Sequence, residues 1–235
     1  MQVCTISILF LQSTSQVFTN LCTWLQLKTE FADEYSFVKI YLNAVVINIL
    51  SWLASIIPWA IGIHFVDIGQ WDNSNADFIL WTDTSGKKRL SFVYAGNGFF
   101  YLLNPHPIMS KVERKIDIFF LEMVTILSAI HHAINFTSPP QRILLFTNSL
   151  DSVGVFDSLS AAEDMHNSVL MAVAGLVLQS SIDLCVRHIE GKKNMHADLL
   201  SHLLLDEYHH KFPHDCVRHF LPPKELLPTQ WTQSF

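Results

Sequence analysis

The chain has 235 residues, of which 50% are hydrophobic and only 15% are charged, so it can bury a sizeable core and does not belong to the disordered class. Its net charge of −6 argues against a protein that wraps nucleic acid by charge alone, because such proteins carry a basic excess. The four cysteines are scattered without a CxxC pair, which indicates free thiols in a reducing compartment. We therefore expect a cytoplasmic or nuclear protein that is not secreted.

Residues 1–75 are predicted to form a helical extension that ends at a polar linker. Within it, residues 44–63 are almost wholly apolar and long enough to span a bilayer. However, Asn48, Ser55 and Pro58 interrupt this stretch, and the single charges that flank it give no clear orientation signal. We therefore favour a buried or partner-facing helix, with a protein tethered to a membrane by residues 44–63 as the alternative.

After the linker, short apolar runs alternate with segments of helical periodicity. The runs at residues 78–81 and 143–146 suit strands buried on both faces, and Gly-Asn-Gly at residues 96–98 is a strong hairpin signal. An antiparallel start followed by strand–helix alternation implies an α/β fold with a mixed sheet and helices on its faces. The expected elements are strands at 77–83, 90–95 and 99–103, a helix at 117–134, a strand at 142–147, helices at 150–159 and 164–179, a strand at 182–189 and a closing helix at 195–205.

The last part of the chain, residues 206–235, is rich in His and Pro and is predicted to be an irregular tail. The histidines between His209 and His219 suggest zinc, which prefers His and Cys ligands. Only Cys216 is available as a thiol there, and the spacing matches no standard zinc finger. We therefore favour a solvated histidine-rich tail over a zinc site.

Two of the predicted buried strands end in nearly the same way, with Thr-Asp-Thr-Ser at residues 82–85 and Thr-Asn-Ser at residues 147–149. Functional groups collect at the carboxyl ends of strands in open α/β sheets, so Asp83 and Asn148 should lie together if these strands are neighbours. Two further acids are Glu122, in the long apolar helix, and Asp198, at the start of the last helix. Taken singly, such acids more often offset a helix dipole or mark a solvated helix edge.

Together these segments resemble ribonuclease H, and more narrowly the ribonuclease H domain of reverse transcriptases from fungal-type retrotransposons. The most specific block is His-Ile-Glu-Gly-Lys-Lys-Asn-Met-His-Ala-Asp-Leu-Leu-Ser at residues 188–201, which is close to the fourth motif of that family. The resemblance covers residues 76–205 and implies a ribonuclease H-like mixed five-stranded sheet with flanking helices. It extends weakly to residues 31–75, which look like the connection after a polymerase thumb, and to residues 220–223. No polymerase palm motif is present, so the chain resembles a fragment of a larger element.

The resemblance also implies a chemistry, cleavage of the RNA strand of an RNA–DNA hybrid with two divalent ions, Mg²⁺ or Mn²⁺. By the same resemblance, Asp83 would bridge the ions, Glu122 and Asp198 would each hold one, and position 148 would supply a fourth carboxylate. Asn148 carries no charge, so we expect weakened ion binding and hydrolysis. Asp151, one turn into the next helix, is an alternative fourth acid, but it better suits an acidic first-turn residue. We expect a retained fold with weak or absent activity and no small-molecule cofactor.

Two short basic segments are candidates for contact with the phosphates of a nucleic acid. The candidates are Lys87, Lys88 and Arg89 in the first predicted turn, and Lys192 and Lys193 in the turn before the closing helix. A run of charges is more often a solvated turn, and both interpretations stay open. A non-catalytic module that binds hybrid or duplex without cutting it is therefore the main rival to an enzyme.

Overall fold

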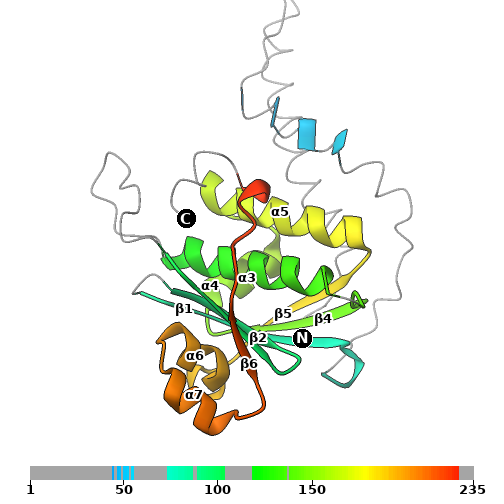
Figure 1. The fold of residues 1–235 in the computed structure, drawn as a ribbon. Coiled ribbons are helices and arrows are strands. Elements are labelled where there is room, and N and C mark those ends of the chain that lie inside the picture. Colours follow the sequence, from blue (N-terminus) through cyan, green and yellow to red (C-terminus); the bar gives the residue numbers. More distant parts are fainter. Residues whose placement is uncertain are drawn as a thin grey trace, which may run out of the picture.

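The computed structural model of the chain describes residues 73–86, 89–103, 118–136 and 138–227, together with isolated helical positions between residues 44 and 55. Most of the predicted helical extension therefore lies outside the described residues. The described part forms one sheet with helices on both of its faces (Figure 1).

The sheet has six strands in the order β5-β4-β1-β2-β3-β6. Strands β1, β2 and β3 form an antiparallel meander, while β4 pairs in parallel with β1 and β5, and β6 pairs in parallel with β3. The predicted α/β fold with a mixed sheet and flanking helices is confirmed, but the sheet has six strands where five were predicted. The strands are β1 (Phe78–Ser85), β2 (Arg89–Tyr94), β3 (Asn97–Leu102), β4 (Arg142–Thr147), β5 (Asp183–His188) and β6 (Cys216–His219).

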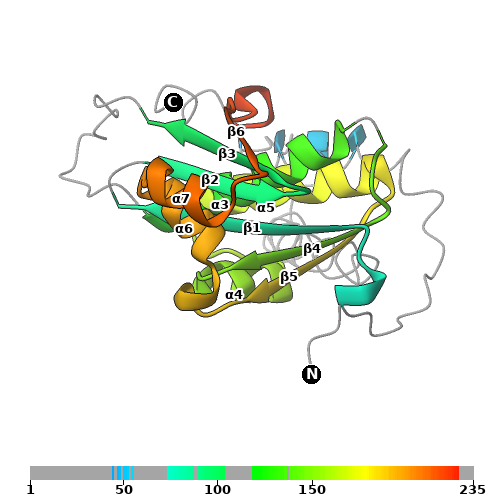
Figure 2. The same ribbon diagram turned by 60° about the horizontal axis from the view of Figure 1, so that its bottom comes forward.

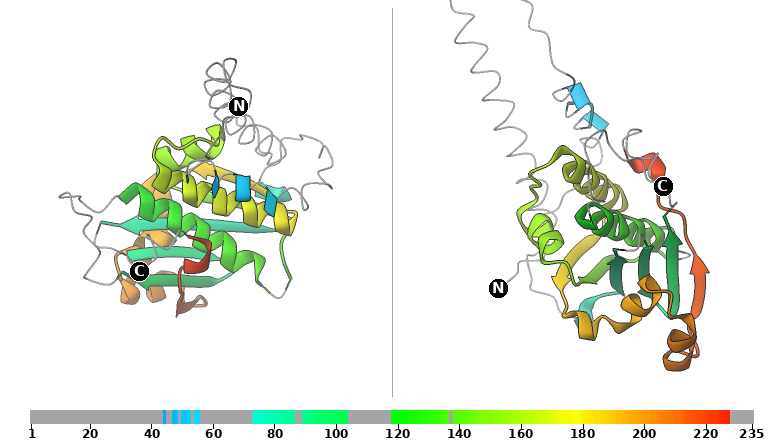
Figure 3. Two further views of the ribbon diagram at one scale, coloured as in Figure 1. Left: turned by 90° about the horizontal axis from the view of Figure 1, so that it is seen from above. Right: turned by 90° about the vertical axis from the view of Figure 1, so that its left-hand side faces the viewer.

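The two faces of the sheet are covered by different helices, as Figures 2 and 3 show. Helices α3, α4 and α5 pack on one face and form the main core with Leu80 and Ile143, both fully buried. Helices α6 and α7 cover part of the other face, where Val93 packs against Leu200 and Tyr208. The helices are α3 (Ile118–Ile134), α4 (Leu150–Ser158), α5 (Asp164–Ser180), α6 (Met195–Ser201) and α7 (Leu205–Lys211), with short 3-10 turns η1 (Asn73–Asn75), η2 (Gly191–Lys193) and η3 (Lys224–Leu226).

The hairpin between β2 and β3 turns one residue earlier than the glycine pattern predicts. Tyr94 pairs with Asn97, so the two turn residues are Ala95 and Gly96, with φ of 50° and 69°. Positive φ at both positions is the requirement of a type I′ turn, whose twist matches that of the flanking strands. Gly98 lies within β3 instead, where it has a packing role.

The predicted closing helix at 195–205 is wrong in its length, because the chain breaks it into α6 and α7. Leu203 adopts the left-handed conformation with φ of 55°. Its N–H donates to the Leu200 carbonyl at 3.0 Å, and the N–H of Leu204 donates to the Leu199 carbonyl at 2.9 Å. This pair of bonds is the Schellman arrangement that ends helices. No glycine or asparagine marks the position, so the sequence carries no usual stop signal there.

Residues 206–226 differ from the irregular tail that the sequence predicts, because they contain most of α7, all of β6 and a 3-10 turn. Tyr208 is fully buried and its hydroxyl donates to Asp215 at 2.7 Å, while Phe220 packs in the main core. These few aromatic anchors order a segment whose remaining residues are largely polar. The segment therefore completes one edge of the sheet.

Two expectations drawn from composition meet different outcomes. Cys216 is a free, exposed thiol as expected, whereas Cys185 on β5 is buried and disulfide-bonded, which contradicts the expectation of free thiols throughout.

Among the described residues, no helix has the length and apolar character needed to cross a bilayer. Most of the possible membrane-spanning segment, residues 44–63, lies outside the part of the chain that the structure describes.

Candidate functional site

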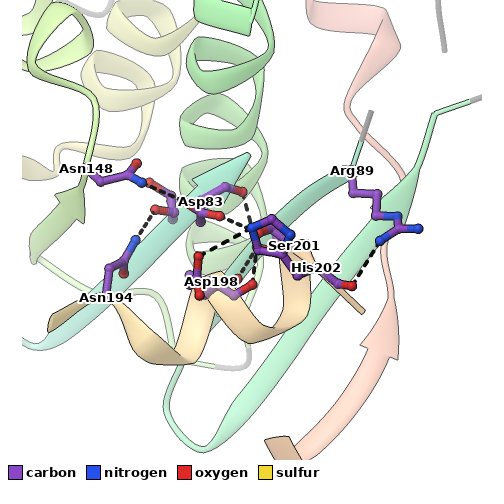
Figure 4. Close-up of polar contacts among 10 residues, drawn as sticks. Asp83, Arg89, Asn148, Asn194, Asp198, Ser201 and His202 are labelled. Atoms are coloured by element: carbon purple, nitrogen blue, oxygen red, sulfur yellow. Dashed lines mark hydrogen bonds and ion pairs between the residues drawn. The ribbon is translucent and has the colours of Figure 1, made fainter. Parts of the chain in front are cut away.

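The carboxyl ends of β1 and β4 bring Asp83 and Asn148 together. The two strands are parallel and Thr82 pairs with Thr147, so the next residue on each strand lies at the same level of the sheet. The Asn148 amide Nδ2 donates a hydrogen bond of 2.8 Å to Asp83 Oδ1 (Figure 4). The site expected from the similar endings of the two strands is thus a direct side-chain contact.

Helix α6 supplies the second partner of Asp83. The Ser201 hydroxyl donates to Asp83 Oδ2, and its Oγ lies 3.0 Å from the Asp198 carbonyl oxygen. Ser201 is the last residue of the block at residues 188–201, but a serine in a helix does not by itself indicate a site residue. Its place three residues after Asp198, and hence on the same helix face, is the signal that could have identified it.

The remaining acid of α6 lies at the solvent edge of the site. Asp83 is only 6% exposed, whereas the Asp198 side chain is 48% exposed. Asp198 Oδ1 lies 3.6 Å from Nε2 of His202, one helical turn later. The site therefore combines one buried carboxyl with one solvated carboxyl that has an imidazole neighbour.

The electrostatic environment raises the pKa of Asp83 above its ordinary value. Burial is the main cause, because it removes the water that would stabilise the charged form. The nearby charge of Asp198 raises the pKa further, while the hydrogen bonds from Ser201 and Asn148 and the charge of His202 oppose the rise.

Glu122 is brought to the same end of the sheet by the direction of α3. Thr125 contacts Thr84 at 2.8 Å between hydroxyl oxygens, and farther along α3 His132 Nδ1 lies 2.7 Å from the hydroxyl of Tyr94. Tyr94 lies on β2 beside the start of β1, so α3 runs antiparallel to β1. Glu122, one turn before Thr125 and partly buried, therefore lies near the carboxyl end of β1.

Asp151, the alternative fourth acid that the resemblance suggests, has the surroundings of a residue at the start of a helix. It is exposed on the first turn of α4, where Ser149 caps the helix by accepting from the N–H of Ser152 at 3.2 Å. An acid at that position offsets the positive end of the helix dipole. The structure thus favours the structural role for Asp151.

The arrangement does not fit the two divalent ions that the resemblance implies. Asp83 already accepts one hydrogen bond on each carboxylate oxygen, and Asn148 presents its NH₂ group, the positive end of the amide. Across the residues that the structure describes, no group of three or more His, Cys, Asp or Glu side chains could hold a metal ion. Asp83, Glu122 and Asp198 are therefore not found grouped as a metal site in the described part of the chain.

The predicted phosphate-binding residues separate into three cases. Arg89 donates to the His202 carbonyl at 3.0 Å, so its guanidinium holds the end of α6. Lys192 and Lys193 are exposed on η2, where Lys193 lies 3.3 Å from Glu190. The turn is anchored beside β1 because the Asn194 amide donates to the Thr82 carbonyl at 2.8 Å. Lys87 and Lys88 lie outside the described residues.

Comparisons with known proteins give a weak structural similarity and no match in sequence. No family model matches the sequence, and no curated protein matches it. Among solved structures, the chain is similar to ribonuclease H1 from the halophilic archaeon Halobacterium salinarum NRC-1, with 15% identity and a TM-score of 0.39 over 56% of this chain and 98% of that one. The fold class follows from the chain's own strand order and pairing.

Proposed function

We propose that this chain contains a ribonuclease H-like domain of retroelement origin, derived from a metal-dependent endonuclease that cuts RNA in RNA–DNA hybrids, and that its own cleavage is weak or absent. The observation that supports the proposal is the meeting of Asp83, Asn148 and the α6 residues Asp198 and Ser201 at one point of the sheet. These residues come from three segments far apart in the sequence, at the end where such folds place their chemistry.

The proposed weakness follows from the residue at position 148. Carboxylates at such a site supply hard oxygen ligands and offset the charge of Mg²⁺, and a neutral amide does only the first. Removing one of four anions is expected to cost about 3–4 kcal/mol of transition-state stabilisation, which corresponds to a rate loss of roughly 100- to 1000-fold. Because the present arrangement does not fit the ions, we assign no reaction step to them in this chain.

A second candidate is a module that binds nucleic acid without cutting it. The exposed Lys192 and Lys193 favour it, because the turn that holds them is fixed by Asn194 to the strand of Asp83. Ammonium groups at that position can meet a phosphate backbone whether or not the neighbouring acids bind a cation.

The decisive experiment is cleavage of a labelled RNA–DNA hybrid by the full chain and by its Asn148→Asp variant, in Mg²⁺ and in Mn²⁺. The variant is expected to cut at least about 100-fold faster than the natural chain. A double variant, Asn148→Asp with Asp83→Asn, should be inactive and controls for a contaminating nuclease. Absence of both hybrid binding and cleavage in all three proteins would contradict the proposal, while binding without cleavage in all three would favour the second candidate.

A further inference from the structure

We infer that the groups around Asp83 form a cation-independent lock, in which the Asn148 amide and the Ser201 hydroxyl occupy the carboxylate oxygens that the resemblance assigns to metal ions. The inference depends on the proposed function for the identity of the cation that is replaced. Its physical basis is the disagreement between the expected metal site and the hydrogen bonds found there.

The first half of the lock joins β4 to β1. Asp83 is buried, so an unpartnered carboxylate oxygen there would cost the free energy of its lost hydration. The NH₂ group of Asn148 satisfies Oδ1 at 2.8 Å. An ionised aspartate at position 148 has no donor to offer to an ionised Asp83, so the contact is lost when both carboxyl groups are charged.

The second half of the lock joins α6 to the sheet. Ser201 satisfies Oδ2 of Asp83, and Ser91 on β2 donates to the Ala197 carbonyl of α6 at 2.8 Å. Ser91 Oγ also lies 3.1 Å from the main-chain carbonyl oxygen of Asp83. Both carboxylate oxygens of the buried acid are therefore satisfied by neutral donors, one from the residue after β4 and one from α6.

The second acid of the site, Asp198, takes no part in the lock. Asp198 is half exposed and lies beside His202, so solvent and an imidazole surround the second acid. An Asn148→Asp change would place a second carboxylate at hydrogen-bond distance from Asp83, with Asp198 nearby. Like charges that close disfavour the ionised forms unless a cation separates them. The stability of the natural chain, which has the amide, should therefore not depend on a divalent cation, whereas the stability of the Asn148→Asp variant should.

The test measures thermal stability of the full chain in a chelator and in MgCl₂ at matched ionic strength, without nucleic acid. The natural chain is expected to shift by less than about 1 °C between the two conditions. In the chelator, the Tm of the Asn148→Asp variant is expected to be at least about 4 °C below that of the natural chain, and MgCl₂ is expected to restore most of this difference. Asn135→Asp, which adds the same charge beyond the far end of α3, is the matched control and should show no Mg²⁺-dependent gain.

Three results would overturn the inference. One is evidence that the natural chain binds a divalent cation. Such evidence is either a rise in its Tm in MgCl₂ that exceeds the rise of the control, or Mn²⁺ bound to the natural chain and detected by electron paramagnetic resonance. Another is an Asn148→Asp variant whose Tm equals that of the natural chain in the chelator. If that variant does not fold, Asn148→Ala replaces it, and an unchanged Tm in the chelator would show that the amide stabilises nothing. These measurements contain no RNA–DNA hybrid, so they test the lock separately from the proposed function. The lock can be refuted while hybrid binding or cleavage is observed, and it can be supported while neither is observed.

Discussion

Thr84 on β1 and Thr125 on α3 share a hydrogen bond of 2.8 Å between their hydroxyl groups. Thr125 also donates to the Leu121 carbonyl one turn earlier, at 2.8 Å, so Thr84 is the donor of the shared bond. This contact fixes the register of α3 on the residue that follows Asp83. It therefore determines how far Glu122 lies from the rest of the candidate site.

Replacing Thr125 by Val, which keeps the side-chain shape, should reduce the free energy of unfolding by about 1–2 kcal/mol, because the Thr84 hydroxyl loses its acceptor. Urea denaturation followed by circular dichroism measures the change. Ser128→Ala is the control, because the Ser128 hydroxyl bonds back to the Val124 carbonyl within α3 and should contribute less than about 0.5 kcal/mol. Equal losses in the two variants would contradict the proposed role of the threonine pair.

The raised pKa of Asp83 predicts a pH-dependent stability. Folding favours the protonated form, so the stabilising effect of Asp83 is complete below its unfolded pKa and is lost as pH rises through its folded pKa. In the Asp83→Asn variant, the new amide oxygen can still accept the hydrogen bond from Asn148, but the side chain carries no charge that must be buried. Its stability relative to the natural chain should therefore increase from acidic to neutral pH. Urea midpoints across that range test this, and a constant difference would refute it.

Gly98 is predicted to be intolerant of a side chain. A Cβ at this position of β3 would lie 2.7 Å from Leu200 Cδ1 and 2.9 Å from the hydroxyl oxygen of Tyr208. Asp215 holds that hydroxyl in place, so Gly98→Ala should cost about 2 kcal/mol through overpacking. Gly154→Ala is the contrast, because its added Cβ would meet no atom within 4 Å beyond its chain neighbours and its own helix backbone, and alanine favours the helix by about 0.5–1 kcal/mol. Thermal unfolding of both variants should give shifts of opposite sign.

The turn that holds Lys192 and Lys193 is predicted to contact phosphates. A variant with both lysines changed to Gln should bind a hybrid more weakly, and the slope of log affinity against log salt should fall by about 1–2. Fluorescence anisotropy at several salt concentrations measures both quantities. A variant with Lys211 and Lys224 changed to Gln removes the same charge from α7 and η3. The prediction fails if that control loses as much affinity and slope.

The sheet and the centre of the site could be predicted because their signals are local. The apolar runs before Asp83 and Asn148 predict buried strands, and parallel pairing of those strands then brings the two side chains together. The resemblance at residues 188–201 placed Asp198 on the correct helix. Helix α3 was predicted to within one residue because its apolar face is long and periodic.

The parts that could not be predicted depend on tertiary contacts. Nothing in the local sequence shows that Ser201 reaches Asp83 or that Arg89 holds the end of α6, because both contacts join segments more than 100 residues apart. Strand β6 was missed because its residues are mostly exposed and show no alternation of apolar and polar residues. The break at Leu203 was missed because a leucine rarely adopts positive φ.

The pairing of β6 with β3 has a consequence for how the chain reaches its folded state. Asn97 and Cys216 lie in register although roughly 120 residues separate them in the sequence. During synthesis, the β2–β3 hairpin leaves the ribosome long before its outer neighbour exists, so the outer edge of β3 stays open until β6 has been made. An unpaired strand edge can pair with the wrong strand during that interval. Pairing of β6 with β3 removes this open edge.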